Sequence, residues 1–489
     1  MSGSVEAIIQ ESSMSPEESA ALARDLAKIV GEEGVSTKMV DRLATCRDFW
    51  PLMGVWFVEG KVPALPDVIV WPKSTAEVAA VLSLANERGI PVTPFGKGSG
   101  VLGGAIPLRG GIVLDTKLMK RVKELDRENL MITVEPGLNG ALYEEYLNRH
   151  GFTGGHFPQS VRCSSVGGWL ACRAAGQLSN RYGKIEDIVV ALEAVLPDGT
   201  VIRGPKKPRT STGPRIDLLF LGSEGTLGVI TEATLSIWPY PEQKAKLSYA
   251  FDSLEQGLTV IRKIMQAGGR PAVVRLYDLD ETAGHFPETR EAEGRCMLVL
   301  LIEGDSTLVS AEVKLAQELA LEEKGLDCGE APVDHWDERR YNVSLSSKMI
   351  RQGAVLDTIE VTANWDNAFT VYKNMREALL NVEGTALASG HYSHVYPEGA
   401  CLYMTICGFA PGDKTEYYKR FWSAAMEACL ASGASIGHHH GLGLHRGLWM
   451  EEEQGENLKI LRRIKQALDP KGIMNPGKLS LEVAEKWQK

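Results

Sequence analysis

The chain has 489 residues, of which 44% are hydrophobic and 24% charged, a composition that can bury a large core and excludes collagen, a disordered chain and a disulfide mini-protein. Its 53 basic and 63 acidic residues give a net charge of −10. This acidic balance argues against a dedicated nucleic-acid binder, which usually has a basic surface. No apolar run reaches the ~18–20 residues that a membrane span needs. The acidic N-terminus is unlike a secretory signal, and the eight scattered cysteines fit a reducing compartment. We therefore expect a cytoplasmic enzyme without a transmembrane segment.

Local signals predict the elements of the first half. Ser15 followed by Pro16 is typical of a helix start, and residues 1–62 are expected to form a helical segment. Ser74 and Glu77 form a capping box for a helix that Gly89 ends. β-Branched runs, small-residue stretches and one Pro-Asp-Gly turn predict the remaining elements. These are strands at 66–72, 90–93, 111–115, 131–134 and 228–238, helices at 140–150 and 164–176, and a hairpin over 188–202.

The second half alternates strands and helices. Strands are predicted at 297–302 and 400–409, and helices at 308–324, 366–380 and 413–432. Such alternation indicates an antiparallel sheet that carries helices, an α+β unit. One more helix, at 456–468, is expected before Asp469-Pro470.

The sharpest motif is a glycine-rich loop after the strand at 90–93. It reads Pro94-Phe95-Gly96-Lys97-Gly98-Ser99-Gly100. Successive small residues let backbone N–H groups converge on an anion such as a pyrophosphate. A Rossmann fingerprint would need a helix to open here, which Gly104 and Pro107 forbid. An ordinary tight turn is the alternative.

Two further segments are rich in small residues. Ser164 to Trp169 opens a predicted helix whose N-terminus favours negative charge, although close helix packing would use the same residues. Gly222 to Thr231 leads a turn into a strand, and by itself it could be a bulged hairpin.

Together, the three segments resemble the FAD-binding domain of the vanillyl-alcohol oxidase, or PCMH-type, flavoproteins. The resemblance spans 63–241 and returns at residues 475–479. The alkylglycerone-phosphate synthase branch matches best, whereas glycolate and D-lactate dehydrogenases are less similar from Ser211 onward. The segments that carry this match are 167–169, 182–187, 211–214, 275–278, 399–403 and 438–441.

The resemblance implies a division of the chain and an α+β fold. A helical segment at 1–62 would precede a two-subdomain PCMH-type FAD-binding domain at 63–241. A substrate (cap) domain at 242–445 would carry an antiparallel sheet with flanking helices. A C-terminal segment at 446–489 would return to the FAD domain.

The resemblance also implies FAD as the cofactor. Its pyrophosphate would lie on the first loop, and its adenine, ribose and ring on later segments. Family members with covalent flavin often carry a histidine in the first loop; none stands here, so we expect non-covalent FAD. The predicted cofactor-binding residues are Pro94, Phe95, Gly96, Lys97, Gly98, Ser99, Gly100, Gln159, Ser160, Val161, Arg162, Cys163, Ser164, Ser165, Cys172, Arg173, Ala174, Ala175, Glu224, Gly225, Thr226, Leu227, Gly228, Val229 and Ile230.

The same resemblance assigns catalytic roles to Tyr403, His438, His439 and His440. Neighbouring like charges lower the pKa of each imidazole, so at least one of the three should be neutral near pH 7 and accept a proton. If the run is extended, His438 and His440 face one way and His439 the other. Tyr403 could exchange a proton if its pKa were depressed.

Arg351 and Arg275 match functional arginines of the branch and are the predicted substrate-binding residues. A guanidinium holds carboxylate and phosphate equally well, so it does not distinguish such substrates. A surface ion pair is the alternative role of either arginine.

A metal site is weighed and not expected. Metal-binding hydroxy-acid dehydrogenases resemble Gly-His-x-Gly-Asp-Gly-Asn-x-His with a later Glu-His-Gly; here only Gly390-His391 begins alike, and His439 stands at the glutamate position. His391, His394 and the triple run could still supply imidazole ligands for zinc. His156 could approach the flavin ring, but a hydrogen-bonded structural histidine is the favoured interpretation.

Three functions stay open. We favour an FAD-dependent oxidoreductase in which a small hydroxylated anion, similar to a 2-hydroxy acid, docks through Arg351 while a neutral histidine takes the hydroxyl proton and hydride passes to flavin N5. The second is alkylglycerone-phosphate synthase itself, a transferase that needs a long apolar tunnel. The third is a non-catalytic flavoprotein. The expected partner is a small anionic substrate; the electron acceptor is unknown, no nucleic acid is expected, and a homodimer is compatible with the sequence.

Overall fold

Helix α1 (Pro16–Val30) begins where the sequence predicts. Ser15 Oγ accepts from the Glu18 N–H at 3.2 Å, and Glu18 Oε2 accepts from the Ser15 N–H at 2.7 Å, so the two residues cap the helix reciprocally. The structure is a computed structural model that describes residues 14–62, 64–342 and 344–481. Residues 1–13 of the predicted N-terminal segment and residues 482–489 of the predicted C-terminal segment lie outside that part. Short elements follow α1: η2 (Glu32–Gly34), β1 (Val35–Ser36), α2 (Met39–Ala44) and α3 (Pro51–Val58).

A small sheet with parallel pairs comes first, in the order β1-β2-β4-β3. Strands β2 (Val68–Val70) and β3 (Val92–Phe95) both run parallel to β4 (Ile112–Asp115). Helix α4 (Thr75–Arg88) starts at the predicted cap Ser74 and ends at Gly89, which has a φ of +66°. The glycine-rich loop thus starts at the end of β3.

The second sheet is antiparallel, in the order β5-β6-β10-β8-β9. Its strands are β5 (Val122–Asp126), β6 (Met131–Val134), β8 (Val189–Val195), β9 (Val201–Arg203) and β10 (Val229–Ser236). The predicted hairpin over 188–202 is confirmed as β8 and β9. The helix predicted at 164–176 is shorter, α6 (Val166–Cys172), because Arg173 takes a left-handed conformation with a φ of +53°. The other elements around this sheet are η3 (Thr116–Leu118), α5 (Gly140–Arg149), β7 (Phe152–Thr153), α7 (Ser179–Tyr182), α8 (Ile185–Ile188), η4 (Asp217–Phe220) and β11 (Trp238–Pro239).

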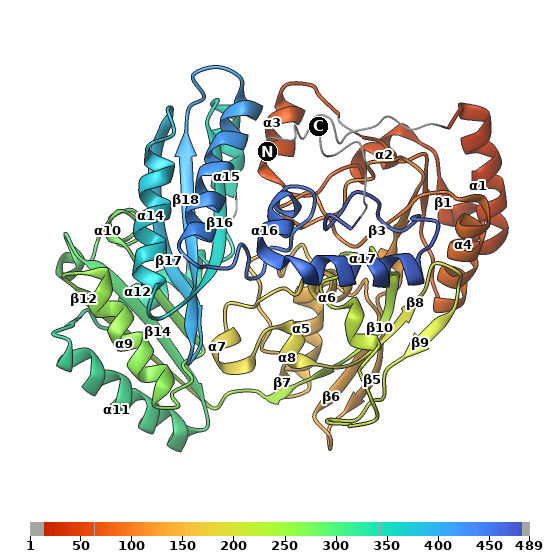
Figure 1. Ribbon diagram of the computed structural model, residues 1–489. Coiled ribbons are helices and arrows are strands. Elements are labelled where there is room, and N and C mark those ends of the chain that lie inside the picture. The colour runs from red at the N-terminus through yellow and green to blue at the C-terminus, as the bar shows by residue number, and fades with distance from the viewer. Residues whose placement is uncertain (1–13, 63, 343, 482–489) are drawn as a thin grey trace.

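The second half forms a seven-stranded sheet in which every pair is antiparallel, in the order β15-β12-β14-β13-β17-β18-β16. Figure 1 shows this sheet and its helices in the left half of the view and the two smaller sheets in the right half. The strands are β12 (Gln243–Phe251), β13 (Val273–Tyr277), β14 (Cys296–Gly304), β15 (Leu326–Asp327), β16 (Val355–Asn364), β17 (Thr385–Val395) and β18 (Gly399–Gly408). The helices are α9 (Leu254–Gln266), α10 (Leu279–His285), η5 (Arg290–Ala292), α11 (Ser306–Glu322), α12 (Ala331–Arg339), α13 (Ser344–Arg351), α14 (Ala368–Leu380) and α15 (Lys414–Ala431).

Strand alternation gives the large sheet two different faces. On β18, Leu402, Met404 and Ile406 are buried in one cluster with Val371 and Met375 of α14. The residues between them, including Tyr403, belong to the opposite face. The helix-covered face is therefore the core, and the other face is left to carry polar groups. The α+β fold expected from the sequence is confirmed.

The C-terminal helices return to the first half of the chain. The C-terminal helices are η6 (Arg446–Trp449), α16 (Met450–Gln454) and α17 (Glu456–Leu468). In Figure 1, α17 lies horizontally in front of the elements of the first half. Lys465 Nζ donates to the carbonyl oxygens of Thr226 (2.7 Å) and Met474 (2.9 Å), and Met474 bridges to Val92 of β3. Among the helices of residues 14–62, 64–342 and 344–481, none is both long and apolar enough to cross a membrane.

Lys465→Ala should destabilise the fold strongly. The substitution leaves two buried carbonyl oxygens and the buried Asp469 carboxylate without their cation, a change that typically costs about 3–5 kcal/mol. The matched control is Lys459→Ala on the same helix, whose exposed pair with Glu456 should contribute at most about 1 kcal/mol. Thermal unfolding of both variants checks this, and equal melting temperatures would refute it.

Candidate active site

Four polar or aromatic residues form one row across the large sheet. In the strand register, Glu360 of β16 faces Tyr403 of β18, Tyr403 faces His391 of β17, and His391 faces Tyr277 of β13. Residues directly opposite in a sheet point to the same face. The row therefore lies on the face that α14 does not cover, and antiparallel pairing joins residues more than a hundred positions apart.

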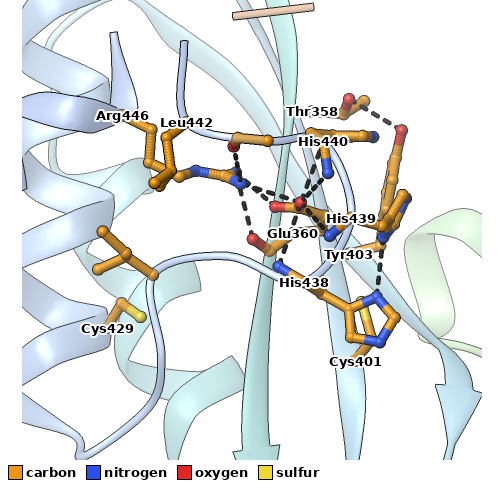
Figure 2. A network of polar contacts seen from close by, with 12 residues as sticks. Thr358, Glu360, Cys401, Tyr403, Cys429, His438, His439, His440, Leu442 and Arg446 are labelled. Carbon is orange, nitrogen blue, oxygen red and sulfur yellow. Dashed lines mark hydrogen bonds and ion pairs between the residues drawn. The ribbon is translucent and has the colours of Figure 1, made fainter. Parts of the chain in front are cut away.

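The histidine run lies over this row as an anchored turn. The backbone N–H groups of His438, His439 and His440 all donate to one oxygen, Oε1 of Glu360, at 3.3, 2.9 and 2.6 Å. Figure 2 shows the carboxylate beneath the turn. The run is a turn rather than an extended segment, so the alternation of an extended run does not apply: the rings of His438 and His439 meet, with their Nδ1 atoms 3.0 Å apart.

Glu360 stays charged beneath this turn. Its side chain and that of Arg446 are both fully buried, and the two form an ion pair in which Arg446 Nη1 donates to Oε1 at 2.9 Å. Burial alone would raise the pKa of Glu360, but the Arg446 guanidinium and His440 hold it well below its ordinary value. The site is thus built on a buried anion that is matched by a buried cation.

The three histidines are neutral near pH 7. Burial is the first cause and lowers the pKa of His438 to about 3; it lowers those of His439 and His440 as well, with neighbouring positive groups adding to the effect. Like-charge repulsion predicts that at least one of the three rings is neutral. The structure agrees with this prediction and makes desolvation the larger cause, for all three rings.

Tyr403 lies between these rings. It stacks on His391 with ring centroids 4.9 Å apart and on His439 at 6.1 Å, and its hydroxyl donates to Thr358 Oγ1 at 2.9 Å. Burial raises its pKa above the ordinary value. The depressed pKa considered in the sequence analysis is therefore not found, and Tyr403 keeps its proton.

Arg275 is held next to the site by His391. Its Nη2 donates to His391 Nε2, while His391 Nδ1 lies 2.6 Å from Glu281 Oε2. A guanidinium can only donate, so Nε2 accepts and the proton of the neutral ring is on Nδ1. Burial lowers the pKa of His391, which agrees with a neutral ring. Arg275 Nε is buried and has no protein partner among the described residues.

Arg351 is not brought to this cluster. It is the last residue of α13 and is exposed, and the described part of the chain offers its side chain no ion-pair partner. Its assignment to the substrate stays a prediction.

The three predicted cofactor segments converge on one another. A Cβ added at Gly96 would lie 2.6 Å from Ser165 Oγ at the start of α6, and one added at Gly225 would lie 2.8 Å from the Pro94 ring. Gly98 has a φ of +62°, where a side chain would strike Phe95. The glycines thus let the first loop approach both other segments.

This loop has the chemistry that a pyrophosphate needs. Within the described residues, the N–H groups of Lys97, Gly98 and Ser99 donate to no protein acceptor, and the buried Ser165 Oγ also has no partner. Unpaired donors at a glycine-rich turn and at a helix N-terminus form a cradle for an anion. The residues present therefore fit FAD.

The remaining predicted cofactor residues lie in different environments. Glu224 to Ile230 are buried as a continuous segment. Val161, Ser164 and Ala175 are buried, and Ser160, Cys172 and Ala174 are half-buried; Gln159, Arg162, Cys163 and Arg173 are exposed.

Glu224 joins the cofactor segments to the histidine turn. Its Oε1 accepts from the Leu442 N–H at 2.6 Å and its Oε2 from the Gly443 N–H at 2.9 Å. Burial raises its pKa to about 7 in spite of these bonds. From the same side, Lys184 Nζ donates to the His438 carbonyl oxygen at 2.6 Å.

One pocket of about 730 Å³ borders both halves of the molecule. Cys172, Glu224 and Thr226 of the first half line it, as do His438 and His439. This volume falls in the usual range of about 300–1,000 Å³ for small-molecule sites. The pocket therefore places the histidines where a ligand held by the cofactor segments could meet them.

Cys401, His438 and His439 could hold a metal ion, since one ligand atom of each lies within 4.8 Å of the others. The two Nδ1 atoms already face each other, however, and burial keeps the Cys401 thiol protonated by raising its pKa. His156 is not the hydrogen-bonded histidine that we favoured: it is buried, neither ring nitrogen has a described partner, and the ring packs on Trp169 at 4.7 Å.

Sequence reasoning missed several residues of the site. Glu360 accepts hydrogen bonds from the backbone of the histidine turn, and Glu281 hydrogen-bonds His391. Tyr396 hydrogen-bonds His438, and Arg446 forms an ion pair with Glu360. In the sequence, Glu360 stands between Ile359 and Val361 in a strand, where a carboxylate is unusual. This position is the local feature that could have marked Glu360 as a residue of the site.

Comparison with known proteins gives the family. Residues 66–204 match the FAD binding domain, and residues 240–479 match the C-terminal domain of FAD linked oxidases. The chain is 32% identical over 453 residues to alkyldihydroxyacetonephosphate synthase of Caenorhabditis elegans, covering 85% of this chain and 76% of the relative. It is 31% identical over 482 residues to YgcU of Escherichia coli O157:H7, described as an uncharacterized FAD-linked oxidoreductase, covering 94% and 98%.

Solved structures share the fold. An alkyldihydroxyacetonephosphate synthase superposes with a TM-score of 0.82 at 24% identity, covering 96% of this chain and 87% of that one. p-Cresol methylhydroxylase superposes with a TM-score of 0.74 at 16% identity, covering 96% and 98%. With its PCMH-type fold and its anion cradle, the chain is an enzyme of the FAD-linked oxidase family, related to the alkyldihydroxyacetonephosphate synthases, and its cofactor is FAD.

Proposed function

We propose that this enzyme oxidises a small hydroxylated anion, similar to a 2-hydroxy acid, with FAD bound non-covalently. One observation carries the proposal: a single pocket is lined by residues of two predicted cofactor segments, among them Cys172 and Glu224, and by neutral, half-buried histidines. The coverage of 98% of a relative described as an oxidoreductase supports it.

The chain's residues would divide the work as follows. Arg275 would bind the substrate anion through its guanidinium, which His391 holds in place. His439 would take the substrate's hydroxyl proton at Nε2, because its Nδ1 is engaged by His438. When bound, FAD supplies the acceptor for the hydride that leaves the substrate carbon. Tyr403 would keep the histidine rings in place by stacking.

A transferase of the alkyldihydroxyacetonephosphate synthase type is the second candidate. The observation that favours it is an aliphatic part of the wall of the same pocket, against which an apolar chain could pack. The aliphatic lining residues are Leu219, Leu221, Leu227, Ile436, Leu442, Met450, Leu458, Ile460, Leu461, Ile464, Leu479 and Leu481.

Anaerobic mixing separates the two functions. We expect 2-hydroxy acids to bleach the flavin absorbance of the FAD-loaded enzyme, because hydride transfer reduces the flavin. Exchange of an acyl-glycerone phosphate with a fatty alcohol, without net bleaching, would instead support the transferase.

Acid precipitation of the same sample should release FAD into the supernatant, whereas retention of the colour in the pellet would contradict non-covalent binding.

His439→Asn should slow flavin reduction by about 10²–10⁴-fold, the usual contribution of a general base. FAD content should not change, since the predicted cofactor segments are untouched. His150→Asn is the control, because His150 lies at the end of α5 and its side chain hydrogen-bonds the Tyr146 carbonyl oxygen, away from the histidine turn. Rapid-mixing kinetics give the rates, and an unimpaired His439→Asn enzyme would remove His439 from the mechanism.

Arg275→Met and Arg351→Met test the two predicted anion-binding residues. Loss of the half-buried, His391-bound guanidinium should raise KM by at least about 10-fold, as expected for a lost charge-assisted pair worth about 1.5–3 kcal/mol. A comparable rise for Arg351→Met would show that this exposed arginine reaches the substrate; an unchanged KM would exclude it.

A further inference from the structure

A line of three hydrogen-bonded side chains leads away from the large pocket to a second one. His438 and His439 both line the first pocket, and Tyr396 lines a neighbouring pocket of about 290 Å³. We propose that His439, His438 and Tyr396 form a proton relay that carries the substrate's hydroxyl proton from the active site to solvent. This inference rests on the proposed oxidation and adds two residues, His438 and Tyr396, with a defined task in it.

The geometry is continuous from ring to ring. His439 Nδ1 lies 3.0 Å from His438 Nδ1, and His438 Nε2 lies 2.6 Å from the Tyr396 hydroxyl. Both distances are within hydrogen-bonding range. The far end faces water, because Tyr396 is half-buried and the exposed Glu398 lines the same small pocket. Figure 2 shows the contact between the two histidine rings beside Cys401.

Burial makes such an exit necessary. Desolvation disfavours the charged form of these half-buried rings, and at His438 the Lys184 ammonium adds repulsion that Glu360 only partly offsets, so neither ring stores a proton as a cation near pH 7. A base in this position works only if it gives up one proton as it takes another. Tyr396 is also kept from ionising by burial, which raises its pKa, so its hydroxyl must accept and donate in one event.

The step balances without charging any ring. In the starting state, His439 carries its proton on Nδ1 and His438 carries its proton on Nε2. The substrate hydroxyl proton moves to His439 Nε2, the Nδ1 proton moves to His438 Nδ1, and the His438 Nε2 proton moves to the Tyr396 oxygen. Tyr396 then releases its own proton to water in the small pocket. Both rings end neutral with exchanged tautomers.

The rings are held in place independently of the relay. The Glu360 carboxylate fixes the backbone of the turn, and the Lys184 ammonium binds the His438 carbonyl oxygen. His394 stacks on His438 at 5.1 Å and lies against His439 at 4.9 Å, and its own Nδ1 is engaged by Ser179 Oγ. Removal of the Tyr396 hydroxyl should therefore interrupt proton transfer without moving the turn.

The tautomers test the relay without any substrate. In FAD-loaded enzyme labelled with ¹⁵N-histidine, and assigned with His438→Gln and His439→Gln, we expect two neutral rings of opposite type between about pH 6 and 8: His438 protonated at Nε2 and His439 at Nδ1. Two rings of the same tautomer, or a cationic ring, would overturn the relay. In Tyr396→Phe, the Nε2–H signal of His438 should shift because its acceptor is gone, while Tyr240→Phe, at an exposed tyrosine, should leave it unchanged.

Kinetics test the transfer itself. With a 2-hydroxy acid that bleaches the flavin, Tyr396→Phe should slow bleaching by about 10²-fold, leave substrate affinity unchanged, and alter the ratio of rates in H₂O and D₂O; Tyr240→Phe should behave as wild type. An unchanged rate and isotope effect in Tyr396→Phe would refute the relay. If no hydroxy acid bleaches the flavin, the proposed oxidation fails, and the tautomer measurement still decides whether the three side chains form the hydrogen-bonded line.

Discussion

A single buried carboxylate oxygen organises the histidine turn. Oε1 of Glu360 accepts three successive backbone N–H groups and also bonds Arg446. Three donors that converge on one acceptor force the backbone into a tight curve, so three neighbouring imidazoles spread from one point. A buried carboxylate is tolerated only with such compensation, and the ion pair with Arg446 keeps it charged. The positions of all three rings depend on this arrangement.

The turn is also fixed by residues from the first half of the chain. Lys184 binds the His438 carbonyl oxygen, and Glu224 binds the N–H groups of Leu442 and Gly443. Glu224 itself has a φ of +47°, in the left-handed region that few non-glycine residues adopt. The histidines are therefore held between a strand of the large sheet and two loops of the first half, and the site exists only where these parts meet.

Local features of the fold could be predicted from the sequence, whereas long-range ones could not. The caps at Ser15 and Ser74 and the β8–β9 hairpin depend on neighbours in the chain, and the structure has them where the patterns indicate. Family resemblance named three separate loops, which the structure brings together at Pro94, Ser165 and Gly225.

The polar partners of the site had no such signal. Glu360 reaches the histidines through strand register and a turn nearly eighty residues away in sequence, and Glu281 reaches His391 from more than a hundred. The directions of the three histidine rings could not be predicted for a related reason. Side chains alternate only in an extended chain, whereas here the Glu360 carboxylate holds the run in a turn. The raised pKa of Tyr403 follows from burial, which no motif encodes.

The pairing of Met474 with Val92 has a consequence for biosynthesis. The edge of the first sheet, next to the pyrophosphate loop, is completed by residues made almost four hundred positions later, and Asn475 Nδ2 then binds the carbonyl oxygens of Gly104 and Glu224. A nascent chain therefore lacks these contacts until residues 474 and 475 have been synthesised. Contacts between residues so far apart in sequence form slowly, so this edge of the first sheet stays incomplete until the two segments meet.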